Sequence, residues 1–399
     1  MSIQLNKSVN NLYFYDKLLS EVANFYHNWD NNSTPSFNFN KTTYIDPPFL
    51  PLFASLGLYL KKYHIGKNIK ENSIIELNNT PDTIKTIHFL DKSEFFDIVG
   101  KQLDYKPVDF SLDIFDFDKK IIGGYSGYIF KEQRNEHKLN VYFPSQDKLL
   151  NYNQLTIEQK SEYRDKLLEK FIVGKVQDDF AQVLYNDEIN RVITSEIVLT
   201  GISELIENGI IHSGSEVFSS IFSSNKRSII SVADIGIGFE ASLGNKSESE
   251  FPLTKFYILN HFKKEKKYIK NFHNCYIIFD ALLFSLNRNR HGLIDVILEY
   301  PTQENGYSRI HDTDLQIVIS NRYFNIIDEI KQLRKKIIKA FTNNMPSVEL
   351  QSLFLKGAEL LIELCERIID NYNIEINVSS IRKFKTRFPG VHIECELKN

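Results

Sequence analysis

The sequence contains few of the residues that build disulfide frameworks or metal clusters. Its 399 residues include only three cysteines, and no two of them have the close spacing of a metal-binding pair: Cys275, Cys365 and Cys395. They therefore indicate neither a structural metal site nor a disulfide scaffold. This cysteine usage fits a reducing compartment, and we expect a cytoplasmic protein.

The chain also lacks a long hydrophobic run and an excess of charge of either sign. Its longest apolar run, Pro47 to Leu60, contains prolines and is too short to span a bilayer. The polar N-terminal stretch has no signal-peptide pattern. The formal net charge of −3 gives no electrostatic basis for nucleic-acid binding. We expect neither a membrane nor a nucleic-acid partner.

The remaining composition is that of an ordinary globular protein, with 42% hydrophobic and 25% charged residues and enough length for two domains. Helical and strand patterns alternate in the first part of the chain and predict a small α/β domain over residues 1–150. Its expected elements are a helix at 12–25, a strand at 42–45, a helix at 46–60, a strand at 73–77, a helix at 93–99, and strands near 110–117, 125–130 and 139–143. A charged helix at 156–171 would begin the second domain, 151–399.

A polar line on one helix is the first candidate functional feature. Apolar residues recur with helical spacing from 202 to 209, while Glu204, Asn208 and His212 follow one another four residues apart. The helix is expected to end at Ser213-Gly214-Ser215. A solvated helix face would explain the polar line. The apolar flanks instead favour a covered helix, in which a carboxylate and an amide need partners.

A glycine loop after a predicted hairpin is the second feature. Strands at 217–222 and 229–233 lead to Asp234, and Gly236 and Gly238 follow at once. The two glycines allow a positive φ and a close approach of backbone to a ligand. An aspartate at such a strand end is well placed to accept a hydrogen bond from an amino group. By itself this loop is weak evidence, because many surface turns have the same pattern.

Taken together and in this order, the two features resemble the nucleotide site of the GHKL ATPase superfamily. That group comprises gyrase, the heat-shock chaperone ATPases, histidine kinases with anti-sigma kinases, and MutL. The polar helix is similar to the family's N box, and the loop from Asp234 to Gly238 is similar to its first glycine box. The resemblance covers about 185–320 and the last strand.

The resemblance implies a Bergerat-type α+β sandwich that binds ATP and Mg²⁺. Asn208 would supply an oxygen to Mg²⁺, and Glu204 would act as the catalytic residue that polarises the attacking water or hydroxyl. Asp234 would accept a hydrogen bond from the adenine amino group, next to space left by the two glycines. His212 would contact phosphate or serve as a structural histidine. The segment 240–272 corresponds to the family's mobile lid.

The family's second glycine box is only partly present. This sequence keeps the final pair, Gly292-Leu293, at the start of a predicted helix, and such a helix start is a plausible anion site. Arg288 and Arg290 could supply the positive charge in place of the missing glycines, or they could face solvent. This departure from the family pattern makes phosphate geometry, and hence hydrolysis, an open question.

An insertion precedes the predicted final strand, 391–397. Two helical apolar repeats, 323–341 and 348–372, predict a helical hairpin within about 322–378. It could pack on its own domain, or offer a surface to a protein partner or a second copy of the chain. The final strand alternates apolar and polar residues, which predicts half-burial. It begins at Val391, where the family usually has a threonine that supports the adenine-binding aspartate.

The N-terminal region resembles, in pattern only, the STAS-like domains that accompany some GHKL ATPases. Its strand-to-helix turn, Asp46-Pro47-Pro48, has no hydroxyl to phosphorylate, so docking or dimerisation is expected. Three functions stay open: an ATPase acting as a nucleotide-driven switch in bacterial signalling or defence, an anti-sigma-type serine protein kinase, and a silent nucleotide-binding scaffold. Glu204 favours catalysis, whereas the poor second glycine box favours the scaffold.

Overall fold

The computed structural model describes 2–28, 33–78, 80–100, 112–117, 137–142, isolated positions between 155 and 179, 196–224, 226–374 and 380–398. These residues form a mixed α/β structure, as expected from the sequence. They contain a four-stranded parallel sheet, a seven-stranded antiparallel sheet and a two-stranded parallel pair. The predicted strand at 125–130 and most of the predicted helix at 156–171 lie outside the described residues.

The parallel sheet belongs to an N-terminal unit, the described residues between 2 and 117. Its strand order is β1 (Ser2–Gln4), β3 (Ser36–Asn38), β5 (Ser73–Glu76) and β6 (Phe115–Phe117), and the pair beside it is β2 (Ser8–Val9) and β4 (Tyr44–Ile45). The helices are α1 (Asn11–Tyr13), the π-helix η1 (Phe14–Leu18), α2 (Leu19–Asn28), α3 (Phe49–Gly66), α4 (Ile84–Lys92) and α5 (Phe95–Val99). The sequence did not predict β1, β2, β3 or α4. The three missed strands have only two or three residues, which is too short to show an alternating pattern.

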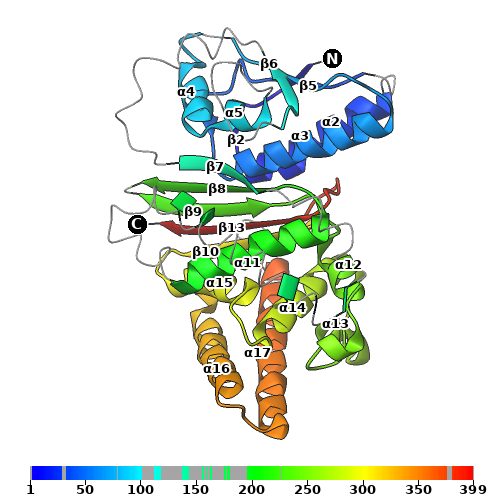
Figure 1. Ribbon diagram of the computed structural model, residues 1–399, viewed down its shortest axis with the longest axis vertical. Coiled ribbons are helices and arrows are strands. Elements are labelled where there is room, and N and C mark those ends of the chain that lie inside the picture. The colour runs from blue at the N-terminus through cyan, green and yellow to red at the C-terminus, as the bar shows by residue number, and fades with distance from the viewer. Residues whose placement is uncertain are drawn as a thin grey trace.

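The antiparallel sheet has N-terminal helices on one face and C-terminal helices on the other (Figure 1). Its order is β12 (Ile381–Lys383), β11 (Leu315–Ser320), β10 (Tyr307–Asp312), β13 (Val391–Lys398), β9 (Arg227–Ala233), β8 (Val217–Ser224) and β7 (His137–Tyr142). Below it lie α11 (Glu196–Ser213), α14 (His273–Leu286) and α15 (Leu293–Glu299). Alternate residues of β8 separate the two cores: Val217 and Ile221 pack with the C-terminal helices, and Phe218 packs with the N-terminal unit.

Strand β7 precedes the expected domain boundary near residue 150, yet it is the edge strand of the larger sheet. Its residues pair with β8 in antiparallel register, from His137 opposite Phe222 to Tyr142 opposite Val217. Among the described residues, the change from one sheet to the other therefore falls between β6 and β7. A single strand carries no sequence signal for the sheet it joins, because its pairing partner lies about 80 residues away.

The prediction of a half-buried final strand is wrong, because both faces of β13 are covered. Ile393 and Cys395 pack with the C-terminal helices. The polar residues that alternate with them are also buried. They are His392, Glu394 and Glu396, which are only 3%, 0% and 2% exposed. Covering them requires polar partners, since an unpaired buried charge is costly.

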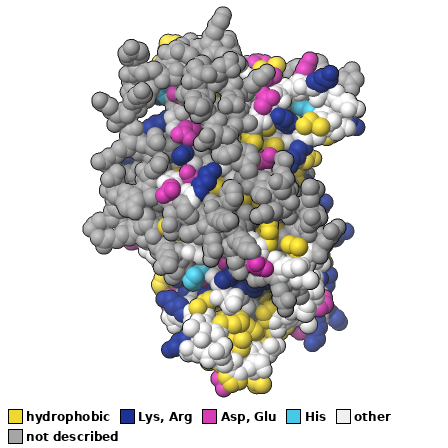
Figure 2. All heavy atoms as spheres, viewed as in Figure 1, with side chains coloured by type: hydrophobic (Ala, Val, Ile, Leu, Met, Phe, Trp, Pro, Cys, Tyr) yellow, Lys and Arg dark blue, Asp and Glu magenta, His cyan; other side chains and the backbone are white. Residues whose placement is uncertain are grey.

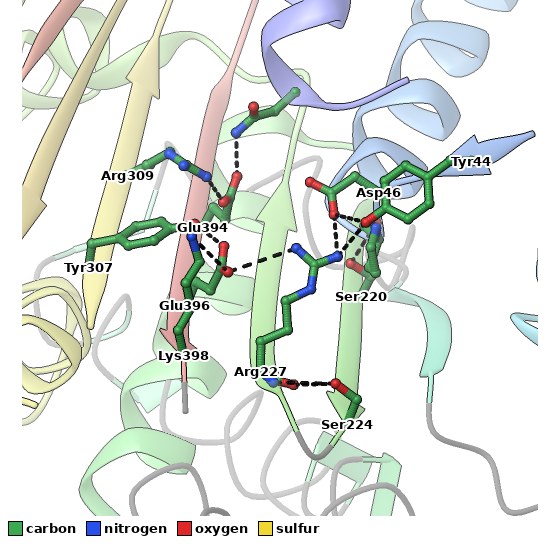
Figure 3. Close-up of polar contacts among 12 residues, drawn as sticks. Tyr44, Asp46, Ser220, Ser224, Arg227, Tyr307, Arg309, Glu394, Glu396 and Lys398 are labelled. Carbon is green, nitrogen blue, oxygen red and sulfur yellow. Dashed lines mark hydrogen bonds and ion pairs between the residues drawn. The ribbon is translucent and has the colours of Figure 1, made fainter. Parts of the chain in front are cut away.

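The N-terminal unit and neighbouring strands supply those partners. The hydroxyl of Tyr15 lies 3.2 Å from Nδ1 of His392. Asn11 donates to the Glu394 carboxylate, and Arg309 pairs with the same group, as the close-up shows for the labelled Arg309 and Glu394 (Figure 3). These polar contacts lie between the N-terminal helices and the antiparallel sheet, so the N-terminal unit packs on that sheet through matched polar groups as well as an apolar core.

A second polar contact holds the turn between β4 and α3 against the sheet. Arg227, at the start of β9, places Nη2 2.7 Å from Oδ1 of Asp46, and Nη1 3.8 Å from Oε1 of Glu396 (Figure 3). The same guanidinium donates to the Tyr44 hydroxyl at 2.6 Å. Asp46 belongs to the strand-to-helix turn Asp46-Pro47-Pro48, which has no hydroxyl group to phosphorylate. Its carboxylate thus contributes to the contact between the two parts of the chain.

The insertion forms the predicted helical hairpin, α16 (Phe324–Thr342) and α17 (Ser347–Ile374). Its apolar stripe packs within the chain: Ile330 and Ile337 of α16 and Leu364 of α17 are fully buried in the C-terminal core. The hairpin nevertheless shows hydrophobic side chains on the face seen in Figure 2, and Val348 is 79% exposed. No helix among the described residues has the length and hydropathy needed to cross a bilayer.

Candidate functional site

One cavity collects side chains from both halves of the sequence motif. It lies between α11, the loop after β9, the helix α12 (Gly238–Gly244), α14 and the start of α15. Eight of the ten site residues expected from the sequence line it: Glu204, Asn208, His212, Asp234, Gly238, Arg288, Arg290 and Leu293. These residues span about 90 positions of the chain, so only the folded structure brings them together.

The remaining two expected residues, Gly236 and Gly292, lie directly behind lining side chains. A Cβ atom at Gly236 would stand 2.7 Å from Oδ1 of Asp234, and one at Gly292 would stand 2.7 Å from Oε2 of Glu204. Both distances are too short for any real Cβ atom. The two glycines thus allow the backbone to approach the acidic groups closely, which is the role glycine serves in such loops.

Helix α11 presents the polar line predicted from its four-residue spacing. Its last residue is Ser213, and Gly214 follows with φ +58°, as the expected C-terminal signal requires. Glu204 is only 6% exposed, and its Oε1 lies 3.4 Å from Nε of Arg290. The neighbouring acid Glu207 is fully buried and does not line the cavity, in agreement with its different phase on the helix.

Asp234 lines the cavity at the end of β9, close to Gly209 of α11. Its Oδ1 accepts hydrogen bonds from the backbone N–H of Gly236, at 2.6 Å, and of Val391, at 3.4 Å. Within the described part of the chain both bonds go to Oδ1, which leaves Oδ2 able to accept from a ligand. Burial raises the pKa of Asp234 to about 6, although the two N–H donors counteract it.

Val391 contacts Asp234 through its backbone. Besides donating to the Asp234 carboxylate, Val391 accepts from the Asp234 N–H through its carbonyl at 3.1 Å. Gly390 precedes it with φ +86°, and a Cβ atom there would overlap the Asp234 carbonyl oxygen. The start of β13 therefore supports Asp234 without a hydroxyl, and it does so only because residue 390 is glycine.

We expect Gly390→Ala to lower the free energy of unfolding by at least about 2 kcal/mol, since the left-handed conformation alone costs an alanine about 1–2 kcal/mol. The overlap with Asp234 adds to that cost. Urea unfolding measures the effect. Gly244→Ala is the matched control, because a Cβ atom there meets nothing within 4 Å. Equal stability of the two variants would contradict the close approach at Gly390.

The loop between α14 and α15 brings both Arg288 and Arg290 to the lining of the cavity. The guanidinium of Arg288 lies 4.9 Å from the ring centroid of Phe284. Arg290 pairs with Glu204, and its side chain is 24% exposed. Positive charge thus stands at the end of the cavity where α15 begins.

Sequence reasoning missed the walls of the cavity. They are formed largely by apolar side chains from several elements, together with two serines and a lysine: Val232, Ile237, Phe239, Leu243, Ala281, Phe284 and Ile393, with Ser242, Ser285 and Lys246. Apolar walls with a few polar groups are typical of small-molecule sites. Only Ile393 had a signal, the alternation of the last strand; the others meet through contacts that no local pattern encodes.

The expected lid segment forms defined elements beside the cavity. After α12 come η4 (Glu248–Glu250), α13 (Tyr257–Lys264) and η5 (Lys270–Phe272). Asp280 of α14 holds the start of α13, accepting from the N–H of Ile258 at 2.8 Å and of Leu259 at 3.1 Å. The lysines of the charged run 263–267 are exposed, as predicted, and they do not line the cavity.

The cavity encloses about 120 Å³. A site that buries a whole drug-sized ligand occupies roughly 300–1,000 Å³. The enclosed part can therefore take a planar ring, whereas a longer ligand needs more space than the cavity offers. Displacement of α12, which forms one wall, would enlarge the space.

A second buried carboxyl lies next to the glycine loop but outside the cavity. Asp312, at the end of β10, is 1% exposed and accepts from the N–H of Phe239 at 3.4 Å. Burial, reinforced by neighbouring acids including Asp234, raises its pKa to about 7. No cluster of three His, Cys, Asp or Glu side chains suited to a metal ion occurs among the described residues.

Comparisons with family models, with curated proteins and with solved structures gave no significant match to this chain. A functional assignment therefore depends on the residues of the cavity and their geometry.

Proposed function

We propose that this chain binds ATP in the cavity between α11 and the loop after β9. The supporting observation is that the polar line of α11, the acidic glycine loop and the start of α15 line a single cavity. An antiparallel sheet with helices α11, α14 and α15 on one face fits the Bergerat-type sandwich of the GHKL ATPases. The N-terminal unit, with parallel strands and intervening helices, would then be the STAS-like domain.

In this proposal the adenine ring enters the apolar part of the cavity, and its amino group donates to Oδ2 of Asp234. The phosphates extend toward Arg288 and Arg290, near the start of α15, where the cationic side chains favour anions. Asn208 and His212 line the path between them. Mg²⁺ would be held by the Asn208 oxygen together with phosphates and water, which matches its preference for few protein ligands.

The site also has a direct connection to the N-terminal unit, which supports a nucleotide-driven switch. Asp234 lines the cavity, while the next residue, Ile235, packs against the N-terminal core. Phe388, two residues before Gly390, contacts the rings of Phe14 and Tyr59 at centroid distances of 5.3 and 6.2 Å. A ligand that shifts the Asp234 loop would therefore shift residues in the shared core.

Glu204 supports catalysis, because it is a carboxylate at the phosphate end of the cavity. Its contact with Arg290 at 3.4 Å keeps it paired, and phosphate oxygens would compete for that arginine. We therefore assign Glu204 the role of polarising the attacking water once Arg290 turns to the phosphates.

A silent nucleotide-binding scaffold is the second candidate. The observation in its favour is the same contact, since a carboxylate neutralised by Arg290 is a poor base. Transfer of phosphate to a protein serine, as in anti-sigma kinases, would need a partner. That partner, or a second copy of the chain, would bind the N-terminal unit or the hairpin. Three buried free cysteines fit a reducing, cytoplasmic setting: Cys275, Cys365 and Cys395. A role in bacterial signalling or defence is proposed from the GHKL resemblance alone.

Thermal unfolding with ATP, ADP and Mg²⁺, followed by phosphate release on the same sample, tests the proposal. A ligand that binds only the folded chain raises its stability by about 2.7 kcal/mol at a hundred times Kd. Stabilisation with phosphate release would support the ATPase switch, and stabilisation without release would favour the scaffold. No stabilisation at millimolar nucleotide would refute ATP binding.

A further inference from the structure

Arg334 of the helical hairpin reaches the back of the arginine-bearing loop. It lies on α16, in the insertion that a minimal ATP-binding sandwich does not need, and it is 4% exposed. Its Nη1 donates to the carbonyl oxygens of Leu286, at 2.7 Å, and Arg288, at 2.6 Å. Its Nη2 donates to the carbonyl oxygen of Arg290. One side chain thus holds the end of α14 and two alternate residues of the loop.

The same guanidinium also holds the start of α15. Its Nε and Nη2 donate to the two oxygens of Asp295, at 3.1 and 3.0 Å. Asp295 in turn accepts from the backbone N–H of Gly292 at 2.9 Å and lies 3.4 Å from Nδ1 of His291. Although burial opposes ionisation, hydrogen bonds from His291 and Arg334 lower the pKa of Asp295 below its ordinary value. The buried cation therefore has an ionised partner.

These contacts use every hydrogen that a guanidinium can donate. Arginine has five N–H donors in a fixed planar arrangement, and Arg334 makes five hydrogen bonds, three to carbonyls and two to Asp295. Lysine has three donors on a single nitrogen and cannot reproduce this pattern. The geometry is specific to arginine.

The loop residues Arg288 and Arg290 contact Arg334 on one side and the cavity on the other. Arg288 and Arg290 direct their carbonyls to Arg334, while their side chains line the cavity on the other side. Fixing the two carbonyls restricts the backbone rotations that would move the two cations. A loop with few glycines can thus present charge in a defined geometry, because a buried side chain supports it from behind.

We propose that Arg334 is a positioning residue that holds Arg288 and Arg290 toward the phosphates, and that the hairpin thereby forms part of the phosphate-binding half of the site. This inference rests on the proposed ATP binding. It assigns the insertion a role in selecting polyphosphate over the bare nucleoside. A purely structural arginine would instead affect the affinities for ATP and adenosine equally.

The test compares ATP and adenosine, with Mg²⁺ present, on the full chain by calorimetric titration and thermal shift. We expect Arg334→Lys and Arg334→Met to weaken ATP binding at least about tenfold, within the usual range of such couplings. Adenosine, which lacks phosphates, should keep its affinity within about twofold. The ratio of the two affinities therefore falls, and this readout does not depend on a modest loss of stability.

Arg367→Met is the matched control, because Arg367 is an exposed arginine of the same hairpin that pairs with Glu363 one turn away. It should leave both affinities unchanged. If Arg334→Met fails to fold, Arg334→Lys provides the comparison. An unchanged ratio in folded variants overturns the inference alone. A wild-type chain that binds neither ATP nor adenosine overturns the proposed function and, with it, the inference.

Discussion

Asp234→Asn is expected to weaken nucleotide binding by at least about a hundredfold, or about 3 kcal/mol, because a charge-assisted hydrogen bond is replaced by a repulsive contact. The carboxylate now accepts from Gly236 and Val391 through Oδ1 and leaves Oδ2 for a ligand. An asparagine that keeps its oxygen on the backbone donors presents an NH₂ group to the adenine amino group. If the amide flips, its NH₂ faces the two backbone donors instead. Titration with ATP measures the loss.

The same substitution should stabilise the chain in the absence of ligand. The pKa of Asp234 rises from its ordinary value of 3.8 to about 6 on folding, so the folded state binds the proton more tightly. The cost of ionising Asp234 is absent below pH 4, grows between pH 4 and 6, and stays constant above that range. At 1.36 kcal/mol per pH unit, Asp234→Asn should be more stable by about 3 kcal/mol at pH 7.5 and equally stable near pH 3.5.

Asp312→Asn is the matched control for both effects. Asp312 is buried beside the same loop, with a pKa of about 7, but it does not line the cavity. We expect it to stabilise the chain with a similar pH dependence and to leave ATP affinity within a few fold. Urea unfolding from pH 4 to 8 and ATP titration separate the two variants. Unchanged ATP affinity in Asp234→Asn would refute the adenine contact.

The opposed effects of Asp234 on stability and binding are what a functional carboxylate should show. A residue retained only for the fold would be expected to stabilise it, whereas this one is desolvated and held ionised by two N–H groups. The ionised Asp234 thus makes the folded chain less stable than a neutral side chain of the same shape would.

The sequence predicted those parts of the site that lie close together along the chain. Glu204, Asn208 and His212 share one helix, and a four-residue spacing is enough to place them on one side. Asp234 and its glycines lie within five residues at a strand end. In both cases local geometry determines the arrangement, so the pattern could be recognised before the structure was known.

The parts that were missed depend on contacts between distant segments. Lys246 reaches the cavity only because α12 turns back against α14, and its Nζ lies 5.1 Å from the Phe284 ring centroid. Arg334 looks like one cation of an amphipathic helix, and its five acceptors lie about 40 residues earlier. The alternation of β13 was read correctly, but half-burial was wrong because nothing in one strand shows what covers its polar face.

Glu204→Gln is expected to spare ATP binding and to lower phosphate release by at least about a hundredfold, the usual contribution of a general base. Glutamine keeps the shape of the side chain and cannot accept a proton from water. Loss of the ion pair frees Arg290 for the phosphates, so ATP affinity should stay equal or rise slightly. Phosphate release and ATP titration on the same preparation measure the two quantities separately.

Glu207→Gln distinguishes a catalytic effect from a general effect on α11. Glu207 lies on the same helix and is fully buried, but it does not line the cavity. It should leave the rate of phosphate release per bound ATP unchanged, even where stability falls. Hydrolysis by Glu204→Gln at the wild-type rate would remove Glu204 from the chemistry. The water would then have to be polarised by phosphate oxygens, with Arg288 and Arg290 supplying charge, and the paired Glu204 would serve only to hold Arg290 until ATP arrives.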